Sequence, residues 1–185
     1  MPLLRQEPDV FPQSLFDTGG LELDSGNWWT MYTLARREKE LVRRLRTLEI
    51  AHYCPLIRKR SRSPAGRVRE SFVPLFPGYV FVRGAEPDRY QALTTNCISR
   101  CLEVPDSPQL TRELAQIHRL IESCAFVSLE SRLVPGQQVR VKSGPMTGME
   151  GTVIRRHGKE WFVIAVNFLQ QGAAVLLEDF QLEVV

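Results

Sequence analysis

Histidine and cysteine are the residue types of this chain best suited to catalysis or metal binding, but their spacing supports neither. The histidines, His52, His118 and His157, are scattered, and no nucleophile, metal-ligand spacing or phosphate-binding loop accompanies any of them. Cys97 and Cys101 could place two ligands on one helical face, but no nearby His or second Cys pair completes a tetrahedral site. The sequence therefore predicts a protein that is not an enzyme and has no metal site and no cofactor.

Positive charge is concentrated in the middle of the chain. Residues 28–125 carry 17 Lys and Arg against 10 Asp and Glu, whereas residues 1–27 are net acidic and residues 134–185 carry five charges of each sign. A basic run surrounds a Ser-Pro-Ala-Gly turn, and its members are Arg58, Lys59, Arg60, Arg62, Arg67 and Arg69. This pattern predicts a charged hairpin tip able to bind nucleic-acid phosphates. A solvated, arginine-rich loop is the alternative.

The sequence predicts neither a membrane span nor a secretory signal. No apolar run approaches the roughly 20 residues that cross a bilayer. The first residues lack a basic region followed by an apolar core. We therefore expect a cytoplasmic protein whose cysteines, Cys54, Cys97, Cys101 and Cys124, are neutral thiols in a reducing compartment.

Strands alternate with helices between residues 28 and 125, which predicts a domain of mixed α and β structure. Aromatic and β-branched runs predict strands over 28–34, 53–57, 79–82 and 98–104, and residues 72–75 lead into a turn or kink at 76–78. Helical periodicity predicts helices over 36–50, 87–93 and 110–124, the last with Thr111 as a cap. Residues 1–27, rich in Pro, Gly and acidic residues, are predicted to be a disordered tail.

The pattern changes after a predicted linker over residues 126–133. Short alternating segments separated by turn glycines predict five strands, over 137–142, 149–156, 161–166, 173–177 and 180–184. Five short strands in about 50 residues are typical of a small closed barrel, which leaves no long edge exposed. The sequence thus predicts a second, all-β domain over 134–185.

Three segments of the chain resemble the signatures of one protein family, and they occur in the order and spacing of that family. Residues 134–153 (VPGQQVRVKSGPMTGMEGTV) are similar to the KOW motif, residues 72–82 (FVPLFPGYVFV) to the FPGY signature of the NusG N-terminal domain, and residues 28–32 (WWTMY) to the opening strand of that domain. The chain therefore resembles the NusG family over residues 28–185. The resemblance implies an α+β protein: a NusG-type α/β sandwich domain over 28–125, then a five-stranded SH3-like KOW β-barrel over 134–185.

In this family the N-terminal domain grips the clamp helices of RNA polymerase and suppresses pausing and termination. By motif position the matching residues are Tyr32, Phe76 and Phe81, for which a place in the core is the alternative. Thr94 and Thr95 resemble a polymerase-contacting loop of the RfaH-like antiterminator branch, with a capped helix end as the simpler interpretation. The basic run over 58–69 lies where the family has a hairpin near upstream or non-template DNA.

The resemblance also implies a partner for the KOW domain, either Rho or a small-subunit ribosomal protein. The residues that correspond to the partner-binding loop are Phe168, Leu169 and Gln171, and glutamine here replaces the usual arginine, which weighs against Rho. The segments 31–37 and 74–77 favour the RfaH-like branch, although the strand pattern gives no reason to expect a helical form of the second domain. The alternative function is that of a KOW-containing RNA-binding or ribosome-associated protein.

Overall fold

The computed structural model describes residues 6–17, 26–62, 66, 68–123, 126–132, 134–177 and 182–185. The chain divides into two compact units, Met1–Ser107 and Pro108–Val185. Helix α3 (Ser107–Ser123) therefore groups almost wholly with the second unit, whereas the sequence placed it at the end of the first domain.

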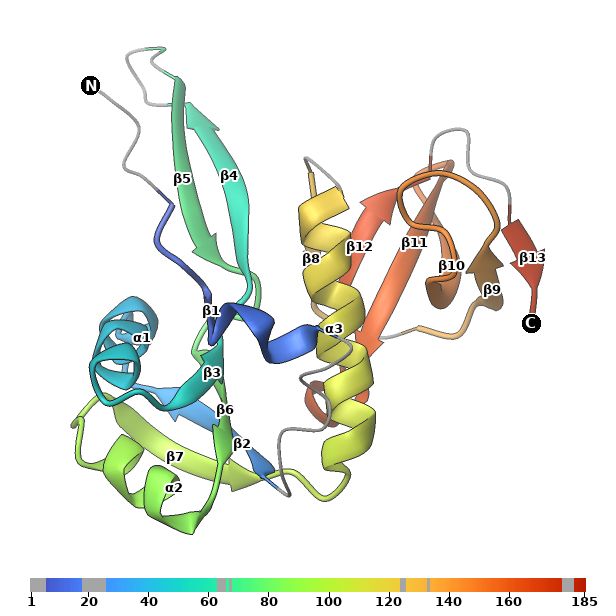
Figure 1. The fold of residues 1–185 in the computed structure, drawn as a ribbon. Coiled ribbons are helices and arrows are strands. Elements are labelled where there is room, and N and C mark those ends of the chain that lie inside the picture. The colour runs from blue at the N-terminus through green and yellow to red at the C-terminus, as the bar shows by residue number, and fades with distance from the viewer. Residues whose placement is uncertain are drawn as a thin grey trace. The chain divides into compact units, whose positions relative to one another are not determined.

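The first unit is built on a five-stranded antiparallel sheet with the order β1-β3-β6-β2-β7 (Figure 1). Helix α1 (Glu38–Thr47) follows β2, and helix α2 (Glu86–Leu93) connects β6 to β7. Helices and antiparallel sheets in one chain confirm the predicted α+β class. The strands are β1 (Val10–Phe11), β2 (Asn27–Thr33), β3 (Ala51–Tyr53), β6 (Tyr79–Gly84) and β7 (Ile98–Glu103).

One hydrophobic cluster of the first unit lies on the face of the sheet that α1 and α2 cover. Leu41 and Leu45 recur on one face of α1 and are fully buried together with Met31 of β2 and Val80 of β6. This is the amphipathic pattern that predicted the helix. Burying such side chains provides most of the free energy that holds a short helix in place.

Strands β4 (Leu56–Arg62) and β5 (Val68–Pro74) form a separate two-stranded hairpin that extends away from the five-stranded sheet (Figure 1). The predicted strand over 53–57 is divided between β3 and β4. Pro55 lies at the break, where a residue without a backbone N–H cannot contribute to a strand ladder. The hairpin predicted from the basic run is present, and its strands are longer than the sequence indicated.

Part of the predicted N-terminal tail is ordered, and this corrects the expectation. Val10–Phe11 pair with β3, and Gln13–Phe16 form a short 3-10 helix, η1, in which Leu15 is only 1% exposed. Proline and acidic residues gave the composition of a disordered segment, but the free edge of β3 supplies backbone partners that composition does not reveal. We call residues 7–16 the N-terminal strap. Residues 1–5 and 18–25 lie outside the described part of the chain.

The second unit contains a six-stranded antiparallel sheet with the order β13-β9-β10-β11-β12-β8. Each of the five predicted strands is present at least in part, and a 3-10 turn, η3 (Asn167–Leu169), precedes β12. The sixth strand, β8, lies in the predicted linker and pairs with β12. Closure of these strands into a KOW barrel stays a prediction. The strands are β8 (Ser128–Glu130), β9 (Gln137–Val141), β10 (Glu150–Arg156), β11 (Lys159–Val166), β12 (Gln171–Leu176) and β13 (Leu182–Val184).

Helix α3 begins earlier than predicted. Thr111 is not its cap but lies within the helix, buried with Leu110 and Leu114. Four polar residues spaced three or four apart form one stripe along the helix and bond to the sheet region of the second unit. These are Glu113, Gln116, Arg119 and Ser123, with partners at Asn167, Glu150, Thr147 and Pro145.

Candidate functional site

The strand register shows on which of the two faces of the five-stranded sheet each side chain lies. One face carries Met31 and Val80 and packs against α1 and α2. Successive side chains of a strand point to opposite faces of the sheet. The residues before and after Met31 in β2, and before and after Val80 in β6, therefore lie on the other face. We call it the aromatic face, and it consists of Trp28, Thr30 and Tyr32 of β2, Tyr53 of β3, Phe76, and Tyr79, Phe81 and Arg83 of β6.

Tyr32 is the exposed member among the three predicted polymerase-binding aromatics, with 41% of its surface accessible. Its ring centroid lies 5.2 Å from that of Tyr79, the residue opposite it in the register. Gly78 has a φ of +85°, and a Cβ there would come within 3.0 Å of the Tyr32 ring. The Pro77-Gly78 turn of the FPGY signature therefore lies directly against Tyr32 and requires glycine for that approach.

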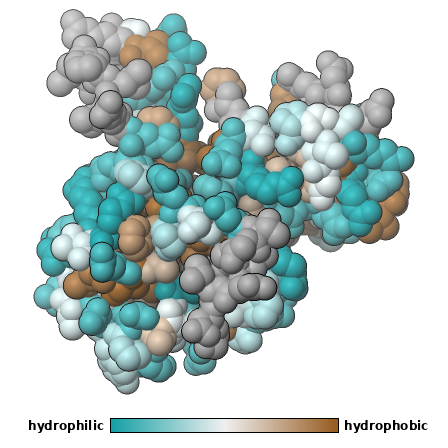
Figure 2. All heavy atoms as spheres, in the orientation of Figure 1, coloured by the Kyte–Doolittle hydropathy of each residue, from teal (hydrophilic) through white to brown (hydrophobic). Residues whose placement is uncertain are grey.

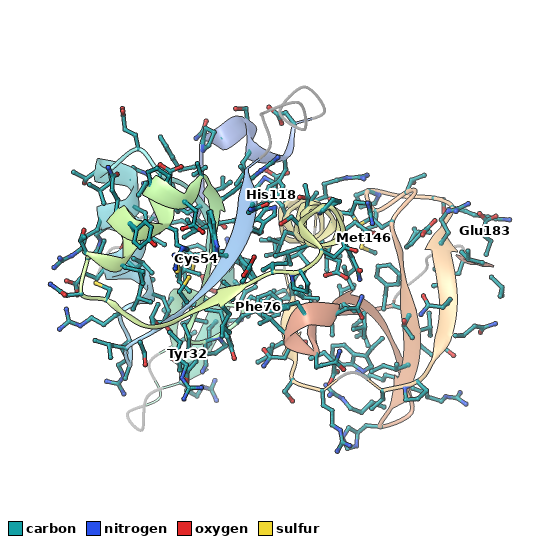
Figure 3. The ribbon with its side chains drawn as sticks, turned by 90° about the horizontal axis from the view of Figure 1, so that it is seen from below. Tyr32, Cys54, Phe76, His118, Met146 and Glu183 are labelled. Carbon is teal, nitrogen blue, oxygen red and sulfur yellow. The ribbon has the colours of Figure 1, made fainter. Side chains whose placement is uncertain are left out.

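Phe76 and Phe81 are buried, 1% and 0% exposed respectively. Their ring centroids are 6.1 Å apart, and the rings are nearly perpendicular at 89°, a favourable edge-to-face arrangement. The structure thus brings Phe76 and Phe81 together and places Tyr32 apart as the accessible ring. Figure 3 labels Tyr32 and Phe76, the exposed and the buried aromatic.

The N-terminal strap covers one end of the aromatic face. The Phe16 ring packs edge-on against Tyr53 at 5.0 Å and stacks on Trp28 at 6.5 Å. Glu7 accepts two hydrogen bonds of 2.8 Å from Arg43 of α1, which hold its pKa below the usual value. The Cys54 N–H donates to the Asp9 carbonyl at 2.7 Å. Side-chain and backbone contacts together hold the strap on the first unit.

Thr94 and Thr95 follow the end of α2. The Thr94 hydroxyl donates to the Gln91 carbonyl and the Thr95 hydroxyl to the Ala92 carbonyl, both at 2.7 Å. Thr95 is buried, and its own carbonyl accepts from Arg44 at 2.9 Å, whereas Thr94 is exposed. Both hydroxyls are therefore used at the helix end, and only Thr94 is accessible to a partner.

The basic side chains of β4 lie on both faces of the β4–β5 hairpin. Arg58, Arg60 and Arg62 occupy alternate positions of β4 and share one face, while Lys59 is on the other. All four side chains are exposed, and hydrophilic surface lines the hairpin in Figure 2. We call Arg58, Arg60 and Arg62 the arginine stripe.

Among the residues that the structure describes, the arginine stripe of the hairpin has few partners. The Arg58 guanidinium carbon lies 6.0 Å from the Phe72 ring, and the ion pair of Arg60 with Glu70 is long, at 3.9 Å. Such exposed pairs contribute little free energy, so the guanidinium groups stay accessible to an anion. Arg67 and the side chain of Arg69 lie outside the described residues.

The predicted partner-binding residues of the second unit lie on consecutive elements. Phe168 and Leu169 belong to η3 and are half-buried, and Gln171 begins β12. Gln170 between them has a left-handed backbone, φ 54°, which turns the chain from η3 into the strand. The structure therefore groups all three predicted residues at one turn.

Burial shifts the pKa of one histidine and two cysteines toward their uncharged forms. Burial lowers the pKa of His52 to about 4, although its Nδ1 lies 2.8 Å from the Ile50 carbonyl oxygen. Burial also raises the pKa of the Cys54 and Cys101 thiols. Within the described ranges no group of three or more His, Cys, Asp or Glu could hold a metal ion. Cys124 lies outside these ranges.

Sequence reasoning missed three accessible neighbours of Tyr32. Arg100 of β7 lies opposite Tyr32 in the register and is exposed, Leu34 follows β2 and is exposed, and Tyr79 packs on the Tyr32 ring. The alternation of β6 could have identified Tyr79, because Tyr79 and Phe81 are two residues apart. Arg100 could not have been identified, because the pairing of β7 with β2 joins residues distant in sequence.

The chain matches the family model for NusG, described as Transcription termination factor nusG, over residues 26–130. That range is more than half of the chain and contains the whole aromatic face, the hairpin and both threonines. The chain belongs to the NusG family. NusG-family proteins are transcription termination or elongation factors that are not enzymes and that generally bind RNA polymerase. Comparison with curated proteins gives no match to the chain.

The NusG match includes α3 and β8 but neither the N-terminal strap nor β9–β13. The strap is thus an addition to the part of the chain that shows the family. None of the helices in the described residues is long and apolar enough to cross a membrane.

Proposed function

We propose that this NusG-family chain binds the clamp helices of RNA polymerase through the exposed end of the aromatic face at Tyr32 and suppresses pausing and termination. Tyr32 is the anchor, and its exposed ring beside Tyr79 is the observation that carries the proposal. Tyrosine makes a large, rigid contact at low entropic cost and is enriched at interface hot spots. Exposed Leu34 and Arg100 provide an apolar and a charged contact beside it.

Phe76 and Phe81 have a supporting role in this proposal. Their buried edge-to-face pair fixes the strand and turn that carry Tyr79 and Gly78, the two residues in contact with Tyr32. Thr94 is the accessible member of the threonine pair, and we assign to it the contact with the opposite side of the polymerase cleft. Thr95 positions the end of α2.

The arginine stripe of the hairpin binds the phosphates of upstream or non-template DNA in the same proposal. Three exposed guanidinium groups on one strand face offer several donors each and no competing strong ion pair among the described residues. The attraction is independent of base sequence and weakens with salt.

The second unit recruits the partner of the factor, for which Rho and a small-subunit ribosomal protein are the candidates. The turn that carries Phe168, Leu169 and Gln171 is the contact, supported by its half-buried aromatic and by the resemblance of residues 134–153 to a KOW motif. A factor of this kind works in the cytoplasm, where transcription and translation are coupled.

Binding of the full chain to core RNA polymerase tests the proposal. Tyr32→Ala should lose about 2 kcal/mol, on the order of thirtyfold in affinity. Tyr90→Ala is the matched control, because Tyr90 is 60% exposed on α2, the helix that packs on the opposite face of the sheet. Tyr90→Ala should leave affinity unchanged, and circular dichroism checks the fold of both variants.

Two results would contradict the proposal. Wild-type protein that fails to bind polymerase would favour the RNA-binding or ribosome-associated function, for which the arginine stripe is the supporting observation. Equal losses in Tyr32→Ala and Tyr90→Ala would show that the aromatic face is not the polymerase site.

A further inference from the structure

The second unit contains a cavity of about 490 Å³ on the surface of its sheet. Its walls come from α3, from strands β8 to β11 and from η3, and every lining residue belongs to the second unit. The volume falls in the range of sites that hold a small organic group rather than a single ion. We call it the acidic cavity, after the carboxylates of Glu113, Glu130 and Glu150 in its lining.

All charged residues that line the acidic cavity are acids, and none of its lining residues is basic. Two of the three carboxylates have arginine partners: Arg156 lies 3.3 Å from Glu130, and Arg140 pairs with Glu150. Glu113 differs from them. It is only 8% exposed, and among the described residues its hydrogen-bond donors are neutral amides.

The partners of Glu113 fix its carboxylate in place. Oε1 accepts from Asn167 Nδ2 at 2.6 Å and from Gln109 Nε2 at 2.8 Å, and Oε2 accepts from the Asn167 backbone N–H at 3.2 Å. These three neutral donors leave part of the acceptor capacity of Oε2 open and do not neutralise the charge. A buried carboxylate without a counter-charge attracts a cation more strongly than an exposed one does, because little water screens it.

The floor of the cavity is apolar. Ile154 and Val163 belong to a small buried cluster of the sheet, and Ala165 lines the cavity next to them. A ligand that fits both parts has a cationic head and an aliphatic stem, as arginine and lysine side chains do. Several amide side chains also line the walls, among them Gln116 and Gln138. The five N–H donors of a guanidinium group match such a set of acceptors better than a compact ammonium group does.

We propose that the acidic cavity binds an arginine side chain presented by a peptide segment of a partner protein. Asn167, which holds Glu113, begins η3, so the arginine would lie beside Phe168 and Leu169. The arginine would thus provide the charged anchor of a surface whose apolar part is that turn. All residues that line the acidic cavity belong to the second unit, so arginine binding there does not depend on polymerase binding through Tyr32.

Titration of the full, isotope-labelled chain with an acetylated and amidated Gly-Arg-Gly peptide tests the proposal by nuclear magnetic resonance. We expect saturable shifts at Gly151, Asn167 and their neighbours. The same peptide with citrulline, which has the shape of arginine without its charge, should bind at least about tenfold more weakly, as for loss of a charged hydrogen bond. Agmatine, a free guanidinium compound, separates a peptide site from a small-molecule site.

Two variants keep the test decisive. Glu113→Gln retains an acceptor and removes the charge, and Ala165→Leu fills the cavity floor without changing any charge. Each should reduce affinity for the arginine peptide at least about tenfold. Glu122→Gln is the matched control, since Glu122 is an exposed acid of the same helix that does not line the cavity.

Absence of saturable binding, equal binding of the citrulline peptide, or shifts that persist in Ala165→Leu would overturn the proposal. Agmatine that binds as tightly as the peptide would overturn the assignment to a partner protein. If Glu113→Gln fails to fold, Ala165→Leu and the citrulline peptide still decide the outcome.

Discussion

At the scale of single residues, His52 shows how burial converts a titratable group into a structural one. Its ring stacks on Phe11 at 5.9 Å, and its Nε2 is buried without a hydrogen-bond partner among the described residues. The folded protein therefore keeps the ring neutral down to a pKa of about 4. The unfolded chain takes up a proton near pH 6.5, so folding stability is lost as pH falls from about 6.5 to about 4.

The His52→Asn variant should abolish this pH dependence. Between pH 7 and pH 4.5 the wild-type protein should lose about 2 kcal/mol more of its free energy of unfolding than the variant does. Urea unfolding at the two pH values measures the difference. His157→Asn is the control, because His157 is exposed at the turn between β10 and β11. Parallel pH profiles for wild type and His52→Asn would show that His52 does not control acid stability.

At the scale of elements, the N-terminal strap should stabilise the first unit although it lies outside the NusG match. Leu15→Ala removes a fully buried side chain and should lower the free energy of unfolding by about 2–3 kcal/mol. Gln13→Ala, at an exposed position of the same 3-10 helix, should change it by less than about 0.5 kcal/mol. Urea denaturation measures both. If both variants change the free energy of unfolding equally and negligibly, the strap does not stabilise the first unit and behaves as the loose tail that the sequence predicted.

The hairpin should bind nucleic acid through the face that carries its three described arginines. Changing Arg58, Arg60 and Arg62 together to alanine should weaken binding to duplex DNA and make it less sensitive to salt. The slope of log affinity against log salt concentration should fall by about one for each phosphate that an arginine no longer neutralises. Fluorescence anisotropy at several salt concentrations measures the slope.

A matched control for the hairpin removes three exposed cations from the second unit. Changing Lys142, Arg155 and Lys159 to alanine lowers the net charge by the same amount and should leave the slope unchanged. If both triple variants reduce the slope equally, DNA binding reflects overall charge and not the arginine stripe.

At the scale of the whole molecule, polymerase binding should belong to the part of the chain that matches NusG. A fragment of residues 1–130 should bind core polymerase with a free energy within about 0.5 kcal/mol of the full chain, as expected when distant sites act independently. The same assay used for Tyr32→Ala measures this. A fragment that is folded by circular dichroism but does not bind would show that the second unit takes part in the polymerase site.

The sequence by itself determined most of the elements and the family. Periodicities of two and of about 3.6 predicted the strands and helices, because local side-chain patterns reflect which faces become buried. The WWTMY and FPGY segments indicated the NusG family, which the match over 26–130 confirms. The basic run around the Ser-Pro-Ala-Gly turn likewise predicted the hairpin, because turn residues act locally.

Only the tertiary structure decided which residues are accessible and which segments meet. Tyr32, Phe76 and Phe81 are equally aromatic in sequence, but only Tyr32 is exposed. The strap is ordered because β1 pairs with β3, a contact between residues about 40 positions apart that composition cannot reveal. The acidic cavity likewise needs α3, η3 and several strands together. Burial and charge compensation depend on contacts between residues far apart in the chain, and those exist only once the chain has folded.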